Sequence, residues 1–268
     1  MVPEPYVESA EDYDAIYSNW DYARDVRLLS ALIKKHCRSG GKDLLDVACG
    51  TGKHLASLKS RYRVEGLDLN SQMLRVARRR LPGIRLHRGS FLEFDVGRKF
   101  DVIICMGSAI GYARTLPGLR RTLRRMAALL KPGGALFIVP WVLESDWKEG
   151  HLHVDSRGEE ERPIARMAFS GRRGSIAVVD MHHLVGTPRG ITHYVERHEL
   201  GLWTVREHLE AAKAAGLRGV WLPKSKDWFR GLLIGKKPLT ASSRPHEKRS
   251  AGAGRPSRRG RARGARRM

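Results

Sequence analysis

The chain has 268 residues, with 50 Lys and Arg against 28 Asp and Glu, which gives a formal net charge of +22. This length can bury one sizeable core without disulfides or metals, and no apolar run approaches the ~20 residues of a membrane span. The acidic stretch 1–14 does not look like a secretory signal. Three cysteines without a C-x-x-C pair argue against a zinc site and for a reducing, cytoplasmic setting.

Strands and helices alternate over the first half of the chain. Helical spacing at 25–37 precedes a strand at 44–47, and a second strand is expected at 64–67. A helix at 71–80, with Ser71 as its N-cap, stops before Pro82. The remaining elements are strands at 84–87, 101–106 and 135–139, with a helix at 116–130 before the last. The pattern predicts an α/β fold with a doubly wound, mostly parallel seven-stranded sheet.

The periodicity changes after the fifth strand. Short apolar runs such as 176–179 and 191–195, broken by glycine-containing turns at 171–174 and 186–190, predict antiparallel strands. A helix at 204–215 follows, with a capping box, and strands at 217–222 and 229–234 close the fold. We expect the β-rich insert to lie over the carboxyl edge of the sheet, where open α/β sheets bind ligands.

The positive charge is concentrated at the end of the chain. Residues 236–268 contain twelve Lys or Arg and one Glu, a balance of +11, and almost no large apolar residue. Such a segment cannot bury enough surface to fold, so 239–268 is expected to be disordered. It could contact nucleic acid non-specifically by counterion release, or be a solvated extension, which is the reading we favour.

The loop after the first strand carries the strongest functional signal. Ala48-Cys49-Gly50-Thr51-Gly52 interrupts an apolar run, leaving bare backbone beside the start of a helix. Asp68 ends the second strand, 22 residues after Asp46, where it can accept both hydroxyls of a ribose. The third glycine of a dinucleotide fingerprint and the spacing of a phosphate loop are both missing. The loop therefore indicates a nucleoside cofactor; the alternative is a turn whose glycines serve tight packing only.

The loop also resembles the first motif of class I S-adenosylmethionine (SAM) methyltransferases, D-x-A-x-G-T-G, which have a Rossmann-like sheet. Over about 13–238 the chain resembles the sugar N,N-dimethyltransferases that finish amino sugars such as desosamine and mycaminose on nucleotide-linked hexoses. The matching segments are Tyr13-Asp14-Ala15-Ile16-Tyr17, 44–52, His87-Arg88-Gly89-Ser90-Phe91, 97–101, Ser108-Ala109-Ile110-Gly111-Tyr112, Pro140-Trp141, 189–193 and Arg230-Gly231-Leu232-Leu233. The resemblance implies SAM as cofactor and methylation of the C3 or C4 amine of a deoxysugar nucleotide.

The resemblance also implies a set of cofactor-binding residues. Gly50, Gly52 and Ala48 would let the backbone approach the methionine part, Asp46 would order the loop, and Asp68 would bind the ribose. The full set expected to bind SAM is Tyr13, Tyr17, Asp46, Ala48, Gly50, Thr51, Gly52, Asp68, Leu69, Met73, Ser90, Phe91 and Met106. Ser90 stands where the family usually has Asp, so a weaker hydrogen bond to the adenine amine is expected there. Core packing is the alternative for each apolar member.

Methyl transfer is an in-line displacement in which a neutral amine is already a good nucleophile, so alignment matters more than a strong base. Tyr17, which would close over SAM, and Tyr112, which would orient the amine, are the expected catalytic residues. The expected acceptor-binding residues are Tyr112, Trp141, Arg166, His182 and Arg230. Aromatic packing and solvated surface charge are the alternatives. Val139, before Pro-Trp, replaces the Glu of the family, and Ser18-Asn19-Trp20-Asp21 replaces its Gly-Lys-rich stretch.

Five parts are expected along the chain: a segment at 1–23 that closes over the cofactor, a SAM-binding core at 24–145, an acceptor-binding insert at 146–203, final core elements at 204–238 and the tail at 239–268. We expect a small-molecule acceptor, no membrane contact, no metal and a homodimer. The alternatives are an RNA or ribosome-associated methyltransferase that uses the basic tail, and a non-catalytic SAM-binding scaffold. The end of the fourth strand reads Met106-Gly107-Ser108-Ala109 rather than the Asn-Pro-Pro-Tyr type of base-flipping motif, which argues against nucleic acid as the acceptor.

Overall fold

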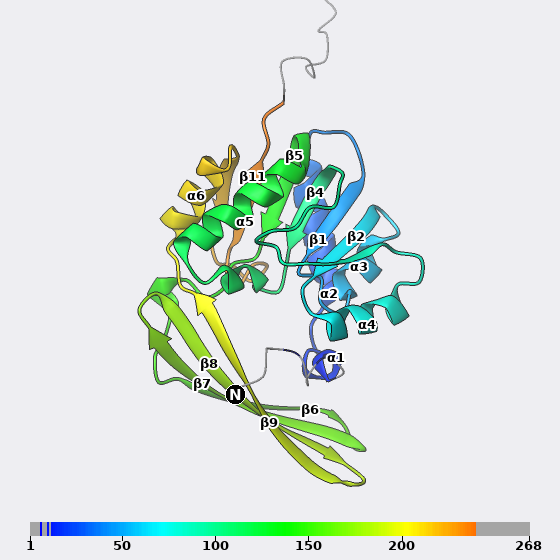
Figure 1. Ribbon diagram of the computed structural model, residues 1–268, viewed down its shortest axis with the longest axis vertical. Coiled ribbons are helices and arrows are strands. Elements are labelled where there is room, and N and C mark those ends of the chain that lie inside the picture. The colour runs from blue at the N-terminus through cyan, green and yellow to red at the C-terminus, as the bar shows by residue number, and fades with distance from the viewer. Residues whose placement is uncertain (1–5, 7–9, 11, 240–268) are drawn as a thin grey trace, which may run out of the picture.

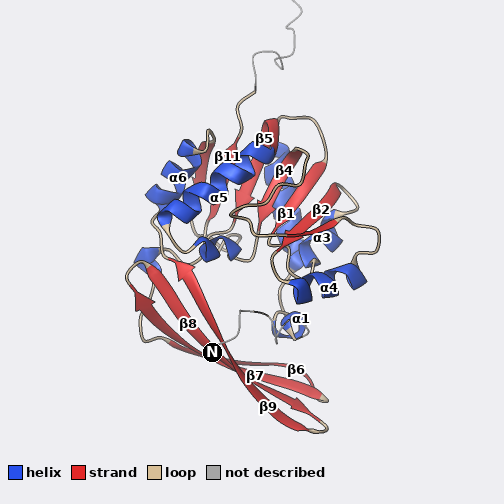
Figure 2. Cartoon of the chain, viewed as in Figure 1, coloured by secondary structure: helices blue, strands red, loops and turns tan. Residues whose placement is uncertain are grey.

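Two β-sheets organise the chain in the computed structural model (Figure 1). The structure describes residue 6, residue 10 and residues 12–239, so nearly all of the predicted tail at 239–268 lies outside the described residues. Figure 2 shows a helix-covered sheet and, set apart from it, the long strands of a second sheet. In the described part of the chain, no helix is long and apolar enough to cross a membrane.

The larger sheet has seven strands in the order β10-β11-β5-β4-β1-β2-β3. The strands are β1 (Asp43–Val47), β2 (Arg63–Asp68), β3 (Leu86–Arg88), β4 (Phe100–Cys105), β5 (Leu130–Ile138), β10 (Arg218–Leu222) and β11 (Leu232–Lys236). β1 to β5 pair in parallel, whereas β11 runs antiparallel to both of its neighbours. This arrangement confirms the predicted doubly wound, mostly parallel fold.

Helices cover both faces of this sheet. They are α2 (Tyr22–His36), α3 (Lys53–Leu58), α4 (Ser71–Arg80), α5 (Leu116–Leu129) and α6 (Val205–Ala214), whereas α1 (Tyr13–Ile16) lies below the sheet rather than on either face (Figure 1). Successive residues of β1 point to opposite faces, so Leu44 packs in the cluster with α2, α3 and α4, and Leu45 in the cluster with α5 and α6. Both leucines are fully buried. The continuous apolar run of β1 therefore follows from burial on both sides.

The smaller sheet is an antiparallel insert between β5 and α6. Its strands are β6 (Leu152–Glu159), β7 (Arg162–Arg173), β8 (Ile176–Thr187) and β9 (Gly190–Gly201), in that order. The insert was predicted, but its strands are longer than expected, and the turn expected at 171–174 lies at 174–175. Gly171 stays in register opposite Val178, so the β7–β8 ladder continues through the glycine and turns only after Arg173.

Three predicted boundaries also change. The N-cap of α4 is Asn70 rather than Ser71, because the Asn70 side chain accepts hydrogen bonds from the backbone N–H groups of residues 72 and 73. β5 begins at Leu130 rather than 135, since its pairing with β4 continues across an irregularity between Phe100 and Val102. β11 begins at Leu232, after Gly231 closes a turn at φ +80°.

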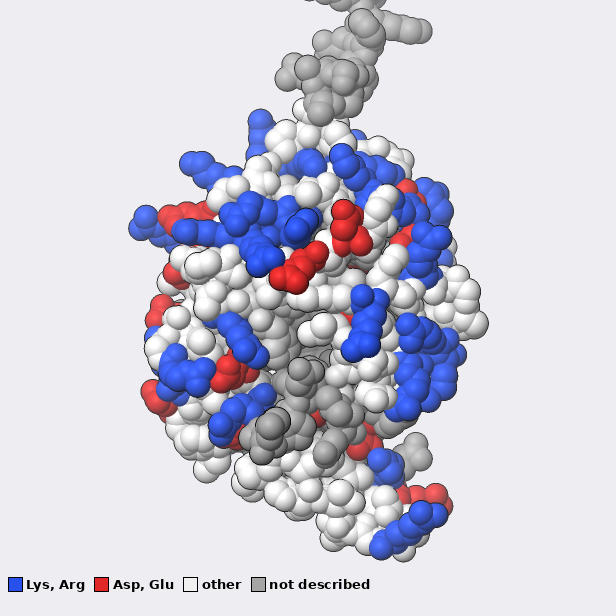
Figure 3. All heavy atoms as spheres, viewed as in Figure 1, with Lys and Arg blue, Asp and Glu red and all other residues white. Residues whose placement is uncertain are grey.

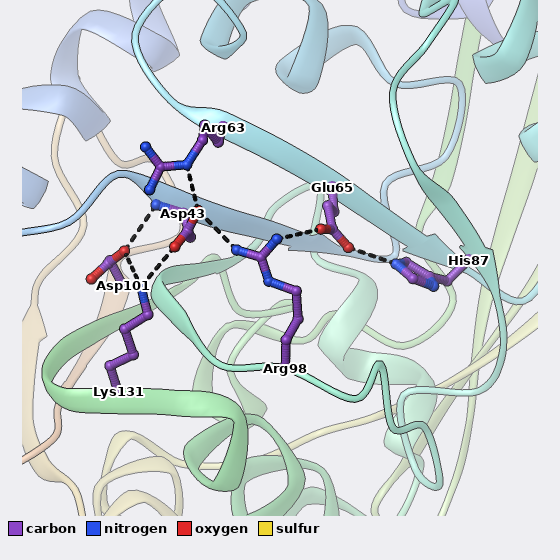
Figure 4. A network of polar contacts seen from close by, with 7 residues as sticks. All are labelled: Asp43, Arg63, Glu65, His87, Arg98, Asp101 and Lys131. Atoms are coloured by element: carbon purple, nitrogen blue, oxygen red, sulfur yellow. Dashed lines mark hydrogen bonds and ion pairs between the residues drawn. The ribbon is translucent and has the colours of Figure 1, made fainter.

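A network of charged side chains spans five neighbouring strands, from Lys131 of β5 to His87 of β3, away from the glycine-containing turn (Figure 4). Lys131 Nζ lies 2.7 Å from Asp43 Oδ2 and 2.9 Å from Asp101 Oδ2. Arg98 links Asp43 to Glu65 at 2.8 and 3.0 Å, respectively. Arg63 and His87 complete the network through Asp43 and Glu65, each at 2.7 Å. These contacts hold the edges of neighbouring parallel strands together.

Candidate active site

The turn between β1 and α3 has backbone geometry that only small residues adopt readily. Ala48, Gly50 and Gly52 have φ angles of +60°, +54° and +78°. A Cβ atom on Gly52 would lie 2.6 Å from Leu81 Cδ1, so a larger residue would also collide with the chain beyond α4. The turn is anchored by the Cys49 N–H, which donates to the Leu67 carbonyl at the end of β2 over 2.9 Å. These constraints explain the small residues found in the sequence.

Two acids, the buried Asp46 and the half-buried Asp68, stand beside this turn. Asp68 accepts hydrogen bonds from the backbone N–H of Gly50 at 2.7 Å and of Asn70 at 2.8 Å. Asp46 is 1% exposed, and among the described residues its Oδ1 has no hydrogen-bond partner. Burial raises the pKa of both carboxyls, and for Asp46 the nearby Asp68 raises it further. The Gly50 N–H of the loop bonds to Asp68, and the expectation that Asp46 orders the loop stays a prediction.

The other residues expected around the nucleoside lie near the carboxyl edge of the sheet. Leu69, directly after β2, is 60% exposed, whereas Met73 on α4 and Met106 after β4 are buried. The Ser90 hydroxyl accepts a hydrogen bond from the Leu92 N–H at 3.2 Å, and Phe91 packs against the α5 side of the core. Their roles toward a cofactor remain predictions.

Helix α1 is tied to the glycine-containing turn by one acid. Asp14 accepts a hydrogen bond from the Thr51 hydroxyl at 2.7 Å and pairs with Arg80 of α4. Arg80 also donates to the Thr51 carbonyl, and Lys53 lies 3.8 Å from Asp14. The segment that precedes the core is therefore held directly against the turn.

The other side of α1 contacts the insert. Asp12, just before the helix, pairs with Arg162 at 2.7 Å, and the Tyr17 hydroxyl accepts a hydrogen bond from Arg166 at 3.3 Å. Ile16 packs with Ile164 and other apolar side chains on the inward face of the small sheet. α1 thus bridges the turn and the insert.

Tyr112 is presented by a short 3-10 helix, η1 (Ala109–Ala113), which follows β4. Its hydroxyl lies 2.6 Å from His198 Nδ1 and 3.0 Å from the Tyr6 hydroxyl. Gly111 allows this approach, because a Cβ there would lie 2.8 Å from Leu200 of β9 and 3.0 Å from Trp141 Cβ. Burial is the main cause that raises the pKa of Tyr112. η1 therefore holds a neutral phenol against the insert.

The residues beneath Tyr112 were missed by sequence reasoning. Glu196, His198 and His183 are each at most 2% exposed, and all point to the inward face of the small sheet. Glu196 Oε2 lies 3.5 Å from His198 Nε2 and 3.9 Å from His183 Nε2. The sequence pattern that could have revealed them is the alternation of Tyr194, Glu196 and His198 along a strand, since residues two apart lie on the same face.

His182 does not line this region, so that prediction is wrong. Strand alternation puts its ring on the outward face, where it is exposed and its Nδ1 lies 3.2 Å from His193 Nε2. Its neighbour His183 is the buried histidine of β8. An error of one position in a strand moves a side chain to the opposite face.

The two arginines expected to bind the acceptor, Arg166 and Arg230, differ in whether an acid already pairs with them. Arg166 pairs with Asp155 at 2.8 Å and lies over the Tyr17 ring. Arg230 lies with its guanidinium carbon 4.4 Å from the centroid of Trp141, and among the described residues its buried Nη1 has no hydrogen-bond partner. Burial lowers the pKa of Arg230. Arg230 is therefore the better placed of the two to receive an anion.

The doubly wound sheet and its glycine-containing turn define a class I methyltransferase. The family model of the methyltransferase domain matches residues 44–134, which include the turn, β2 and β4. The bare backbone, the buried oxygen of Asp46 and the acid at the end of β2 fit a nucleoside with a polar amino-acid tail.

Similar proteins show which group of methyltransferases the chain belongs to. The chain is 37% identical, over 85% of its length and 90% of the relative's, to dTDP-3-amino-3,6-dideoxy-alpha-D-glucopyranose N,N-dimethyltransferase from Streptomyces fradiae. The crystal structure of DesVI from Streptomyces venezuelae matches with a TM-score of 0.79 and 32% identity, covering 87% of this chain and 98% of that one. SAM-bound CalS10, an amino pentose methyltransferase from Micromonospora echinaspora, matches with a TM-score of 0.75 and 32% identity, covering 88% and 98%. This chain belongs to the sugar N-methyltransferase family and uses SAM as its cofactor.

Proposed function

We propose that the chain transfers methyl groups from SAM to the amine of a nucleotide-linked amino sugar. The observation that carries this proposal is the convergence of the glycine-containing turn, the tyrosines of α1 and η1, and the inward face of the insert at one edge of the sheet. The names of the relatives support an amino sugar as the acceptor. They do not support the alternative of RNA methylation.

When bound, SAM supplies an electrophilic methyl group. The residues of the chain would orient the acceptor nitrogen and exclude water, since a neutral amine needs alignment more than activation. Tyr17 and Tyr112 are the proposed catalytic residues, and each can accept a hydrogen bond from the amine through its phenol oxygen. Residues 1–23 would close over the cofactor, 24–145 would bind it, 146–203 would receive the acceptor and 204–238 would complete the core.

Arg230 is proposed to bind the diphosphate of the nucleotide, with Trp141 beneath its guanidinium. Arg166 already has Asp155 as a partner, so it would contribute less free positive charge. Arg230→Met should raise the acceptor KM by about 10- to 100-fold, the effect expected when a hydrogen bond to a charged group is lost. Affinity for SAM should not change. Arg189→Met, at an exposed hairpin turn, is the matched control.

The acceptor class is tested with methyl-labelled SAM and purified protein. Pools of dTDP-linked 3-amino and 4-amino deoxysugars, hydroxyl acceptors and RNA are offered separately, and products are identified by mass. We expect label in the amino sugars, as one or two methyl groups on nitrogen. Label that enters RNA or hydroxyl acceptors alone would contradict the proposal.

A homodimer is the proposed assembly. The outward face of the insert exposes large apolar side chains over all four strands, and such faces on soluble proteins mark interaction sites. They are Leu152, Val154, Met167, Phe169, Leu184 and Ile191, with exposed fractions of 47–77%. Sedimentation should give a dimer that the double variant Val154→Lys, Met167→Lys dissociates. A wild-type monomer at micromolar concentration would contradict this assembly.

Non-specific contact between the tail and nucleic acid is also proposed. The basic segment at 239–268 adds to arginines on α4 and α5 that are themselves exposed, and Figure 3 shows Lys and Arg over much of the visible face. Removing 240–268 should weaken salt-sensitive RNA binding and leave turnover intact. Free thiols at Cys37, Cys49 and Cys105 support a reducing cytoplasm as the compartment.

A further inference from the structure

A buried polar cluster lies between the insert and η1, behind the face that Tyr112 presents. Glu196 and His198 are 2% and 1% exposed, and both come from β9. The backbone N–H of Tyr6 donates to Glu196 Oε1 at 2.9 Å, and His198 Nδ1 reaches the Tyr112 hydroxyl. A buried carboxylate and imidazole are costly for stability unless they are paired, and such groups concentrate at functional sites.

The contacts of His198 restrict where its protons lie. His198 Nε2 lies 3.5 Å from Glu196 Oε2 and has no hydrogen-bond partner among the described residues, so the tautomer with its hydrogen on Nε2 points that hydrogen toward a carboxylate. Nδ1 of the neutral ring is then the acceptor for the Tyr112 hydroxyl at 2.6 Å. If Nδ1 gains a proton, it donates to Tyr112 instead, and the Tyr112 hydroxyl can turn to the Tyr6 oxygen 3.0 Å away. The cluster therefore offers hydrogen-bonding partners for both proton states.

We propose that His198 and Glu196 form a proton relay behind Tyr112, which removes the proton released by each methylation. The inference rests on the proposed N-methylation. Each new N–C bond leaves a cationic nitrogen, which must lose one proton before its lone pair can attack a second methyl group. Its N–H bond breaks as Tyr112 Oη takes that proton, and the phenol O–H bond breaks as His198 Nδ1 takes the second. The bonding electrons stay on nitrogen and oxygen, no group is oxidised, and Glu196 balances the imidazolium.

Tyr112 cannot perform this step alone. Burial raises the pKa of its hydroxyl, so a phenolate is disfavoured and the phenol can pass a proton on only if another group takes its own. His183 is less suitable, because burial lowers its pKa and it lies 3.9 Å from Glu196. The titratable groups that face His198 are Tyr6 from the N-terminal segment, Tyr112 from η1, His183 from β8 and Glu196 from its own strand, while Asp180 of β8 lies on the opposite face of the sheet and acts on His198 only through its charge. Asp180 is already paired with the exposed Arg197.

The kinetic test uses His198→Gln and Glu196→Gln, with His193→Gln on the outward face of the same strand as the matched control. Turnover of a dTDP-linked amino sugar is followed between about pH 6 and pH 10. His198→Gln should lower kcat by about 100-fold at neutral pH, as loss of general base catalysis does. The loss should shrink as pH rises, because hydroxide replaces the relay, and acceptor KM should change less than threefold. An unchanged kcat and pH profile in both variants would overturn the proposal.

A second measurement does not depend on turnover. In ligand-free protein labelled with ¹⁵N-histidine, Glu196→Gln should shift the Nε2 resonance of His198, because a neutral amide replaces the carboxylate that faces this nitrogen. Tyr112→Phe should shift the Nδ1 resonance, and His193→Gln should change neither. No response of His198 to either variant would overturn the relay, whatever the acceptor proves to be. Failure of the wild-type protein to methylate amino sugars, with these responses intact, would count against the proposed function instead.

Discussion

Asp68, the last residue of β2, has two expected roles. It holds the Gly50 N–H of the turn, and it is the acid expected to accept the ribose hydroxyls. Asp68→Ala removes both, so SAM affinity should fall by about 100-fold or more, corresponding to two or more hydrogen bonds to a charged group. Calorimetric titration with SAM measures this. Glu93→Ala, an exposed acid nearby, should bind SAM as the wild type does, and normal affinity in the Asp68 variant would contradict the cofactor placement.

At the level of single residues, features formed by adjacent residues could be predicted from the sequence, whereas contacts that depend on pairing between strands could not. The turn at 48–52 follows from adjacent small residues, so its position was predictable. Glu196 and His198 meet Tyr112 across a separation of more than 80 residues, and no local pattern links them. His182 was mistaken for an inward residue because only strand register decides between it and His183.

Among the elements, strands β1 and β4 were predictable because burial on both faces leaves a continuous apolar run. β6 was missed because it alternates apolar outward residues with His153, Asp155 and Arg157, which face inward, so no apolar run marks it. The length of β7 and β8 was also missed, since their pairing continues through Gly171. The position of β6 and the length of β7 and β8 are therefore set by pairing with neighbouring strands rather than by local sequence preference.

The charged network of Figure 4 should make the core acid-sensitive. Arg63 is the main cause that holds the pKa of Asp43 below its usual range, and bonds to Lys131 lower that of Asp101 despite its burial. Carboxyls with lowered pKa in the folded state stabilise the fold above their unfolded pKa of about 4 and lose that effect as pH falls below it. Urea unfolding at a series of pH values should show stability decreasing below about pH 4.

The variant Lys131→Met measures how much the charged network contributes to the stability of the fold. It leaves Asp43 and Asp101 with one cation fewer, so the free energy of unfolding at neutral pH should fall by about 2 kcal/mol, between the values for exposed and buried pairs. Part of the loss below pH 4 should disappear in this variant. Lys59→Met, at an exposed position, is the control. Equal stability of the two variants would show that the network is dispensable.

On the scale of the whole molecule, Asp14 is the contact that joins α1 to the cofactor-binding turn. Asp14→Asn keeps the shape but weakens the ion pair with Arg80, so α1 should dock less firmly against Thr51. Both SAM affinity and acceptor KM should worsen, each by about tenfold if one charged contact is lost. Calorimetry and steady-state kinetics measure the two effects, with Asp95→Asn as the control. A change in SAM affinity alone would mean that α1 does not couple the two regions.

The attachment of α1 to both the turn and the insert affects how the cofactor and the product are released. One short helix is fastened to the turn through Asp14 and to the insert through Asp12 and Tyr17. Loosening α1 on one side should therefore weaken its contact on the other side. We expect the spent cofactor and the finished product to be released in the same movement of α1 rather than in two independent steps.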